Sequence, residues 1–86
     1  MKNGLIIDIY GNKYWYKEGQ LHREDGPACE YANETKYWYK DGRCHREGGP
    51  AIEYANGSKC WYLNGKEINC KSQKEFEKYL KLKAFT

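Results

Sequence analysis

The chain repeats itself every 23 residues, and this period constrains its fold more than any local signal does. The segment from Lys36 to Ser58 matches the sequence on either side of it when it is shifted by one period. The motif HREDGPA at 22–28 returns as HREGGPA at 45–51. Such a period is typical of an array in which each copy packs on its neighbours.

Turn dipeptides divide each copy into short strands. Asn-Gly at 56–57 follows an apolar run, whereas Asp-Gly at 41–42 and Asn-Gly at 64–65 follow Trp-Tyr pairs. All three are strong signals for two-residue hairpin turns. We therefore predict a mainly β fold, in which three antiparallel β-meander repeats form one twisted sheet over residues 5–69.

The array is expected to open with a half-copy. Residues 5–13 fit the frame of residues 51–59, but their core positions are more apolar. Atypical copies of this kind are expected at the end of an array.

Two-residue turns would also determine the register, and register determines which side chains share a face. With a turn at Asn56-Gly57, Ile52 lies opposite Trp61, which also lies opposite Ile68. One face then carries the rows Ile6, Trp15 and His22; Cys29, Trp38 and His45; and Ile52, Trp61 and Ile68. The other face carries Leu5, Tyr16 and Leu21; Ala28, Tyr39 and Cys44; and Ala51, Tyr62 and Glu67, with Glu30, Tyr37 and Arg46 alongside. We expect the Trp face to pack and the Tyr face to be amphipathic.

The pattern changes to that of a helix after the third Trp-Tyr pair. Ser72 and Glu75 have the spacing of a capping box, and Phe76, Tyr79 and Leu80 fall on one helical face. We predict a helix over residues 72–83 that caps the last Trp row, and a single domain over residues 1–86.

Charge and hydropathy argue against some partners. Residues 1–65 carry nine Lys or Arg against nine Asp or Glu, so the array lacks the basic stripe of a polyanion-binding sheet. No run approaches the roughly 20 apolar residues of a membrane span, and residues 1–10 lack the apolar core of a signal peptide. We expect a cytoplasmic protein that does not bind membranes.

Two residue sets raise the question of catalysis or metal binding. His-Arg-Glu occurs at 22–24 and again at 45–47, whereas a single active site needs one constellation. We interpret the motif as a structural corner in which His covers Trp, Arg pairs with a cross-strand Glu and Glu caps the Gly-Pro loop. The cysteines lack the close pairing of zinc ligands and fit the frame as small buried side chains. We predict no catalytic residue, metal or cofactor, and Cys70, outside the frame, is the cysteine to watch for reactivity. The expected structural residues are Trp15, His22, Trp38, His45, Trp61 and Ile68.

The Tyr face is the expected partner site, because tyrosine offers rigid contact area with a polar tip. Tyr39, near its centre, would be the hot spot. The residues we expect to contact a partner are Tyr14, Tyr16, Arg23, Tyr37, Tyr39, Arg46 and Tyr62.

The pattern WYxxGxxHRExGPAxEYxxxxK resembles MORN-type repeats, specifically the HREDGPA variant found in small proteins of bacteriophages and large DNA viruses. The resemblance covers residues 5 to about 69. It implies β-hairpins laid side by side in an elongated sheet that contacts proteins and sometimes lipids. For a small viral protein, it implies an accessory factor that binds a host protein, such as a CRISPR effector.

We therefore expect a non-enzymatic protein-binding module that inhibits a larger host protein or ribonucleoprotein. The alternative is a nucleic-acid-binding protein, or a competitor at a protein–nucleic-acid complex, since aromatic rings beside lysine can stack bases. An enzyme is the third hypothesis. The open edges of the sheet also predict self-association, with a homodimer as one form.

Overall fold

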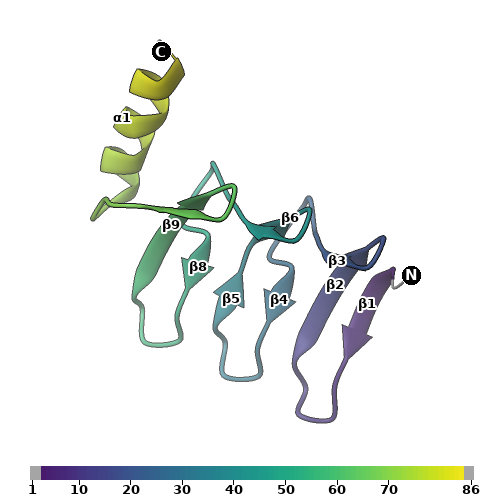
Figure 1. The fold of residues 1–86 in the computed structure, drawn as a ribbon. Coiled ribbons are helices and arrows are strands. Elements are labelled where there is room, and N and C mark those ends of the chain that lie inside the picture. Colours follow the sequence, from purple (N-terminus) through teal and green to yellow (C-terminus); the bar gives the residue numbers. More distant parts are fainter. Residues whose placement is uncertain (1–2, 85–86) are drawn as a thin grey trace.

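The computed structural model describes residues 3–84. It is mainly β, with antiparallel strands followed by one C-terminal helix (Figure 1). The elements are β1 (Gly4–Ile7), β2 (Lys13–Lys17), β3 (Gln20–Leu21), β4 (Cys29–Glu30), β5 (Lys36–Tyr37), β6 (Tyr39–Lys40), β7 (Arg43–Cys44), β8 (Ile52–Glu53), β9 (Lys59–Leu63), β10 (Lys66–Ile68) and α1 (Gln73–Ala84). Among these residues, no helix is long and apolar enough to cross a membrane.

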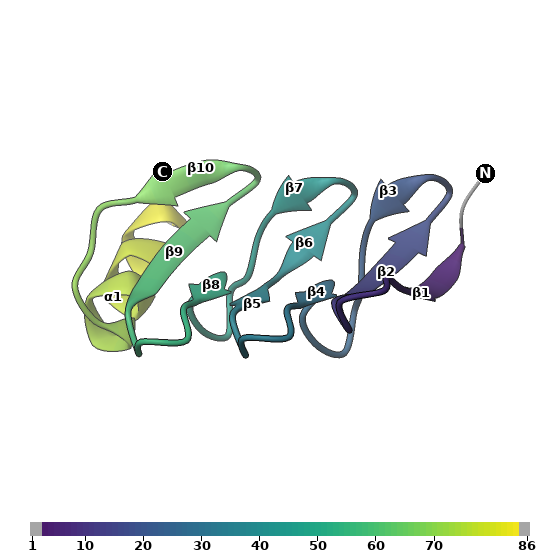
Figure 2. The same cartoon turned by 90° about the horizontal axis from the view of Figure 1, so that it is seen from below.

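The strands form two sheets rather than the single sheet expected. One has the order β1-β2-β4-β5-β8-β9-β10, with β3 paired to β2, and the other contains only β6 and β7. Trp38 separates β5 from β6, so the second copy has two short strands where the other copies have one strand of five residues. Figure 1 shows the hairpins β1-β2, β4-β5 and β8-β9 side by side. Figure 2 shows the hairpins β2-β3, β6-β7 and β9-β10 in a second row.

Successive copies are joined by the same backbone hydrogen bonds at intervals of 23 residues. Each bond in the first copy has an equivalent in the second, so the period of the sequence is also the period of the backbone contacts. The pairs are Trp15 N–H to Ala28 O and Trp38 N–H to Ala51 O; Arg23 N–H to Tyr39 O and Arg46 N–H to Tyr62 O; and Gly42 N–H to Leu21 O and Gly65 N–H to Cys44 O.

The turns after the Trp-Tyr pairs have the expected two-residue form. Both residues have positive φ at Asp41-Gly42 and at Asn64-Gly65, as a type I′ turn requires. Ile68 accordingly pairs with Trp61, as expected. The first copy makes the same turn with Glu18-Gly19, where a glutamate adopts φ of 52°.

The register prediction at Asn56-Gly57 is wrong by one residue. Ile52 pairs with Cys60, not Trp61. Tyr54 N–H donates to Ser58 O and Gly57 N–H to Tyr54 O, and of these loop residues only Gly57 has positive φ. The connection is therefore a longer loop, in which one left-handed residue follows a type I turn. Asn-Gly marked the turn correctly, but it did not determine the loop length.

A slip of one residue exchanges the faces of the affected strands. Cys29 pairs with Tyr14 and Tyr37, and Ile52 with Tyr37, so both lie on the Tyr face. Cys29 and Ile52 are buried there, whereas Trp15 and Trp38 are only half-buried. The expected burial of the tryptophan itself is therefore confirmed only for Trp61, in the last copy.

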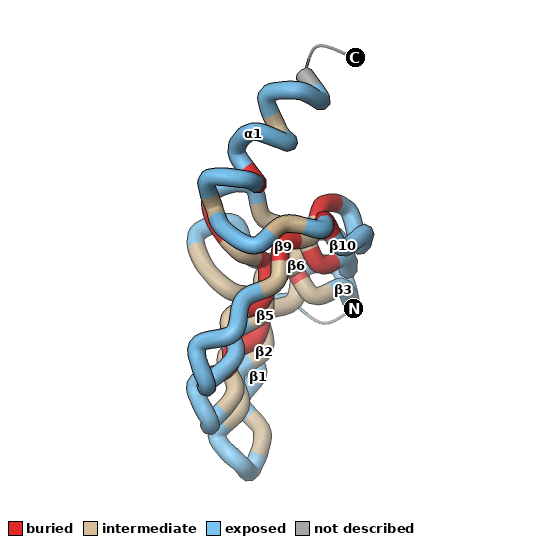
Figure 3. The backbone as a smooth tube through the Cα atoms, turned by 90° about the vertical axis from the view of Figure 1, so that its left-hand side faces the viewer, coloured by how far each residue is buried: buried red, intermediate tan, exposed pale blue. Residues whose placement is uncertain are grey.

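The last copy holds the most continuous apolar core. Phe76 of α1 is completely buried, at 0% exposure, against Trp61, Leu63 and Ile68. The helix starts close to its expected position, and Ser72 Oγ accepts from Glu75 N–H at 3.2 Å. The Glu75 carboxylate accepts from Lys71 N–H at 2.9 Å, one residue before the cap. Figure 3 shows that buried residues gather where the two rows of hairpins meet, while the loop tips and most of α1 are exposed.

Candidate interaction surface

Tyrosine rings form a connected layer on the face of the sheet opposite the tryptophans. Tyr37 is its centre, with ring centroids 5.4 Å from Tyr31, 6.2 Å from Tyr39 and 6.4 Å from Tyr54. Tyr31 also contacts Tyr14 edge-to-face at 6.0 Å. We call Tyr14, Tyr31, Tyr37, Tyr39 and Tyr54 the tyrosine layer. Edge-to-face contacts of this kind add to the energy of burial and restrict ring motion.

Small buried side chains lie beside the tyrosines of the layer on neighbouring strands. Cys29 lies between Tyr14 and Tyr37 in register, and Cys44 pairs with Tyr39. Burial raises the pKa of the Cys29 thiol to about 11 and that of Cys44 to about 12. Both thiols therefore stay protonated at neutral pH and act as apolar packing.

Four members of the layer, Tyr14, Tyr31, Tyr37 and Tyr39, are half-buried. Burial raises the pKa of Tyr31 to about 12, so its phenol is neutral at physiological pH. Tyr54, in the loop after β8, is the most exposed member at 38%. The layer is thus a rigid, uncharged and partly exposed aromatic surface.

The His-Arg-Glu corners lie on the tryptophan side and are structural, but their roles differ from those expected. The guanidinium of Arg46 stacks over Trp38, with Cζ 3.9 Å from the ring centroid. Arg46 Nη1 also donates to Pro50 O and to Glu53 Oε2. Arginine, rather than histidine, covers the tryptophan, and arginine, rather than the glutamate of the motif, caps the Gly-Pro loop. The expected pairing of arginine with a strand glutamate is confirmed. The first copy repeats these contacts with Arg23, Trp15, Pro27 and Glu30.

The histidines connect each copy to the next. His22 Nδ1 accepts from Asp41 N–H at 3.0 Å, and His45 Nδ1 accepts from Asn64 N–H at 2.9 Å. The other ring nitrogen of His22 bonds Glu24 at 3.2 Å. Since Nδ1 accepts, the proton of a neutral ring lies on Nε2 and is donated to the carboxylate. Both nitrogens of His22 are therefore occupied by the fold, as the structural interpretation of this motif requires.

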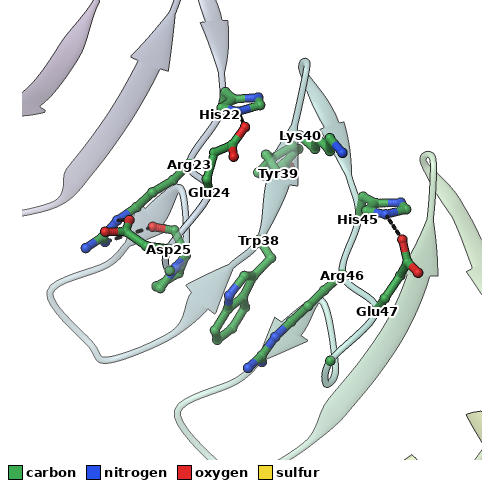
Figure 4. A pocket seen from close by; sticks show the side chains of 13 residues that line it. His22, Arg23, Glu24, Asp25, Trp38, Tyr39, Lys40, His45, Arg46 and Glu47 are labelled. Atoms are coloured by element: carbon green, nitrogen blue, oxygen red, sulfur yellow. Dashed lines mark hydrogen bonds and ion pairs between the residues drawn. The ribbon is translucent and has the colours of Figure 1, made fainter. Parts of the chain in front are cut away.

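A groove of about 610 Å³ lies between the two corners. His22, Arg23 and Glu24 line one wall, and His45, Arg46 and Glu47 line the other, with Trp38 between them (Figure 4). Its charges are mixed and mostly paired with one another. The groove holds an acid, a base and a cation from each corner, but these groups bind the fold rather than face a common reaction centre.

Within residues 3–84, no three His, Cys, Asp or Glu side chains gather into a group that could hold a metal. All four cysteines are free thiols. Cys70 is half-buried against the cluster under α1, and burial raises the pKa of its thiol.

The structure divides the expected partner-binding residues between the two faces. Tyr14, Tyr37 and Tyr39 belong to the tyrosine layer, and Tyr16 and Tyr62 share its face through alternation along β2 and β9. Arg23 and Arg46 lie on the opposite face, over the tryptophans.

Sequence reasoning missed two members of the layer, Tyr31 and Tyr54. They recur at the 23-residue spacing, which was a usable signal, but they lie in loops rather than in the expected strands. Their position depends on the longer loops that shift the register. No family model, curated protein or solved structure matches this chain.

Proposed function

We propose that the chain is a non-enzymatic protein-binding module that uses the tyrosine layer to contact a larger protein. The observation that carries this proposal is the pre-ordered ring network, in which Tyr37 contacts three other tyrosines at 5.4–6.4 Å. Rings already held in place lose little conformational entropy on binding. A central aromatic patch is also the usual composition of a binding hot spot.

The biological setting proposed for this module rests on the MORN-like repeat pattern. We propose a viral accessory protein acting in the host cytoplasm, which blocks a host defence protein such as a CRISPR effector. Its mode of action is stoichiometric occupation of a surface.

The interior contacts of the array favour this proposal over catalysis. Each His-Arg-Glu corner directs its side chains at a neighbouring turn, a tryptophan or a strand carboxylate. An acid–base residue must instead be free to reach substrate. The surface best arranged for an external contact is the tyrosine layer.

The first experiment is affinity capture from host lysate with tagged protein, with a nuclease-treated sample in parallel. We expect one protein to be recovered in a stoichiometric amount from both samples. Recovery that disappears with nuclease would replace the proposal with the nucleic-acid alternative, which also predicts a steep loss of affinity with salt.

Substitutions then connect the captured protein to the layer. Tyr39→Ala is expected to weaken its binding by about 2 kcal/mol or more, a roughly 30-fold loss. Tyr39 also packs against the buried cluster around Cys44 and Ile52, so thermal unfolding must be measured for the same variant.

A matched pair of tyrosines removes that ambiguity. Tyr54 in the layer and Tyr79 on α1 are almost equally exposed, at 38% and 36%. Tyr54→Ala should weaken binding and Tyr79→Ala should leave it unchanged. Equal binding by wild type and Tyr54→Ala, together with normal binding by folded Tyr39→Ala, would exclude the layer as the interface.

A further inference from the structure

The N-terminal edge of the sheet exposes a run of large apolar side chains. Leu5, Ile6 and Ile7 of β1 are 48%, 37% and 56% exposed, and Ile9 in the following loop is 92% exposed. Tyr10 extends the run at 75%. Among the described residues, β1 pairs with β2 and no strand lies on its other side. An unpaired edge with apolar side chains is a template for association.

The 23-residue frame shows what covers this edge inside the array. Leu5 corresponds to Ala28 and Ala51, which are both 0% exposed. In those copies a preceding Trp-Tyr strand pairs with the outer edge, since β2 pairs with β4 and β5 with β8. The outer edge of β1 therefore corresponds to the strand edge that joins successive copies inside the array. Within residues 3–84, no strand pairs with it.

The repeat position of Ile7, which is Glu30 and Glu53 in the other copies, distinguishes between two ways of completing that interface. The partner of β1 is either a Trp-Tyr strand of another chain or the β1 strand of another chain. Glu30 lies opposite both Lys13 and Lys36, and Glu53 lies opposite both Lys36 and Lys59. Each interior carboxylate thus meets the first lysine of a Trp-Tyr strand on either side. At the equivalent position β1 carries Ile7, which would meet a lysine without a counter-charge if a Trp-Tyr strand of another copy paired there. The outer edge of β1 therefore lacks the carboxylate that would pair with the lysine of a Trp-Tyr strand at the C-terminal end of another array.

We infer that β1 is the interface of a two-fold homodimer, in which the β1 strands of two copies pair antiparallel with each other. In this arrangement Leu5, Ile6 and Ile7 face the same apolar residues of the partner copy, which favours burial on both faces of the strand. The antiparallel alternation of the sheet continues across the interface. A two-fold contact uses the same edge on both copies, so it closes after two chains and does not grow into a filament.

The sharpest test replaces Ile7 with the array's own residue. Ile7→Glu places a glutamate opposite Lys13, as Glu30 lies opposite Lys36 in the next copy, so the fold should accept it. In the dimer the two new carboxylates lie at a shared apolar edge, where burial and like charge both oppose pairing. We expect the dimer dissociation constant to rise by about 100-fold, because each copy contributes roughly a factor of 10. Sedimentation over a concentration series measures this change.

The control is Leu82→Glu, which makes the same kind of change on α1 at a side chain that is 70% exposed. It should leave the dimer intact. Hydrogen exchange provides a second readout. By strand alternation the amides of Leu5 and Ile7 face the open edge, whereas that of Ile6 faces β2. The amides of Leu5 and Ile7 should become protected as wild-type protein is concentrated and should stay unprotected in Ile7→Glu.

Several results would overturn this inference. The first is a wild-type protein that stays monomeric at the highest concentration reached. The second is a series of oligomers that keeps growing with concentration. The third is an Ile7→Glu variant that associates as well as wild type. An Ile7→Glu variant that associates more tightly would indicate pairing with Lys59 of another copy instead.

Discussion

Trp38 and Trp61 occupy the same position of the repeat but are covered in different ways. Trp38 is half-buried under the Arg46 guanidinium, which is held by Glu53. Trp61 is buried against Phe76, and its Nε1 donates to Gln73 Oε1 at 2.7 Å. The arginine position of the third copy is Asn69, so α1 takes the place of the arginine at the end of the array. We call Arg46 the polar cover of Trp38 and Phe76 the apolar cover of Trp61. The polar cover is used where another copy follows, and the apolar cover is used at the end of the array.

The largest effect should come from removing the apolar cover. Phe76→Ala should cost about 3–5 kcal/mol, because it leaves a cavity against Trp61 that the sheet cannot close. Denaturant unfolding followed by far-UV circular dichroism measures the loss, with Leu82→Ala as an exposed control on the same helix. A cost below about 1 kcal/mol would mean that α1 does not stabilise the array.

A smaller effect is expected from crowding the polar cover. A Cβ at Gly49 would lie 2.7 Å from Arg46 Cζ, whereas a Cβ at Gly48 would meet nothing within 4 Å. Gly49→Ala should therefore displace Arg46 from Trp38 and cost about 1–3 kcal/mol, an overpacking penalty. The adjacent Gly48→Ala should stay within about 0.5 kcal/mol of wild type. Equal melting temperatures for the two variants would show that the stacking geometry carries no energy.

Salt should distinguish the two covers. The Arg46–Glu53 pair is partly solvent-exposed, so Glu53→Gln should cost about 0.5–1 kcal/mol at low salt. That cost should shrink as salt screens the charges. The cost of Phe76→Ala should not change with salt, and a Glu53→Gln cost equally independent of salt would contradict an electrostatic role for this pair.

The smallest effect near neutrality should come from pH. Burial raises the pKa of Cys29 to about 11 and that of Cys44 to about 12, against 9.0 for an ordinary thiol. The folded state therefore holds these protons more tightly, so the stability that the two thiols contribute is constant below about pH 9 and is lost as pH rises from there toward the folded values. Melting temperature between pH 7 and 10.5 measures the decline, and Cys44→Ala should reduce its slope. An unchanged slope in this variant would mean that Cys44 does not contribute.

Much of the fold followed from the period. Local backbone preferences determine the turns at Asp41-Gly42 and Asn64-Gly65 and the start of α1. These preferences, like the repeat length, can be read from the sequence. The assignment of faces failed because the loop at 54–58 and the equivalent loops at 31–35 and 8–12 are longer than two residues. A dipeptide does not specify loop length. For the candidate site, the strand tyrosines were found, whereas Tyr31 and Tyr54 became neighbours of Tyr37 only through the longer loops at 31–35 and 54–58.

The sequence by itself determined that this chain is a β array with a helix after it, because periodicity and turn residues act over a few positions. Tertiary structure decided which side chains cover one another. Arginine rather than histidine lies on Trp38, since the tight approach of Gly49 leaves room for a flat guanidinium there. Whether an apolar residue is core or surface depends on a neighbouring strand, and for that reason Cys29 is buried while Ile6, at the same position of the repeat, is exposed.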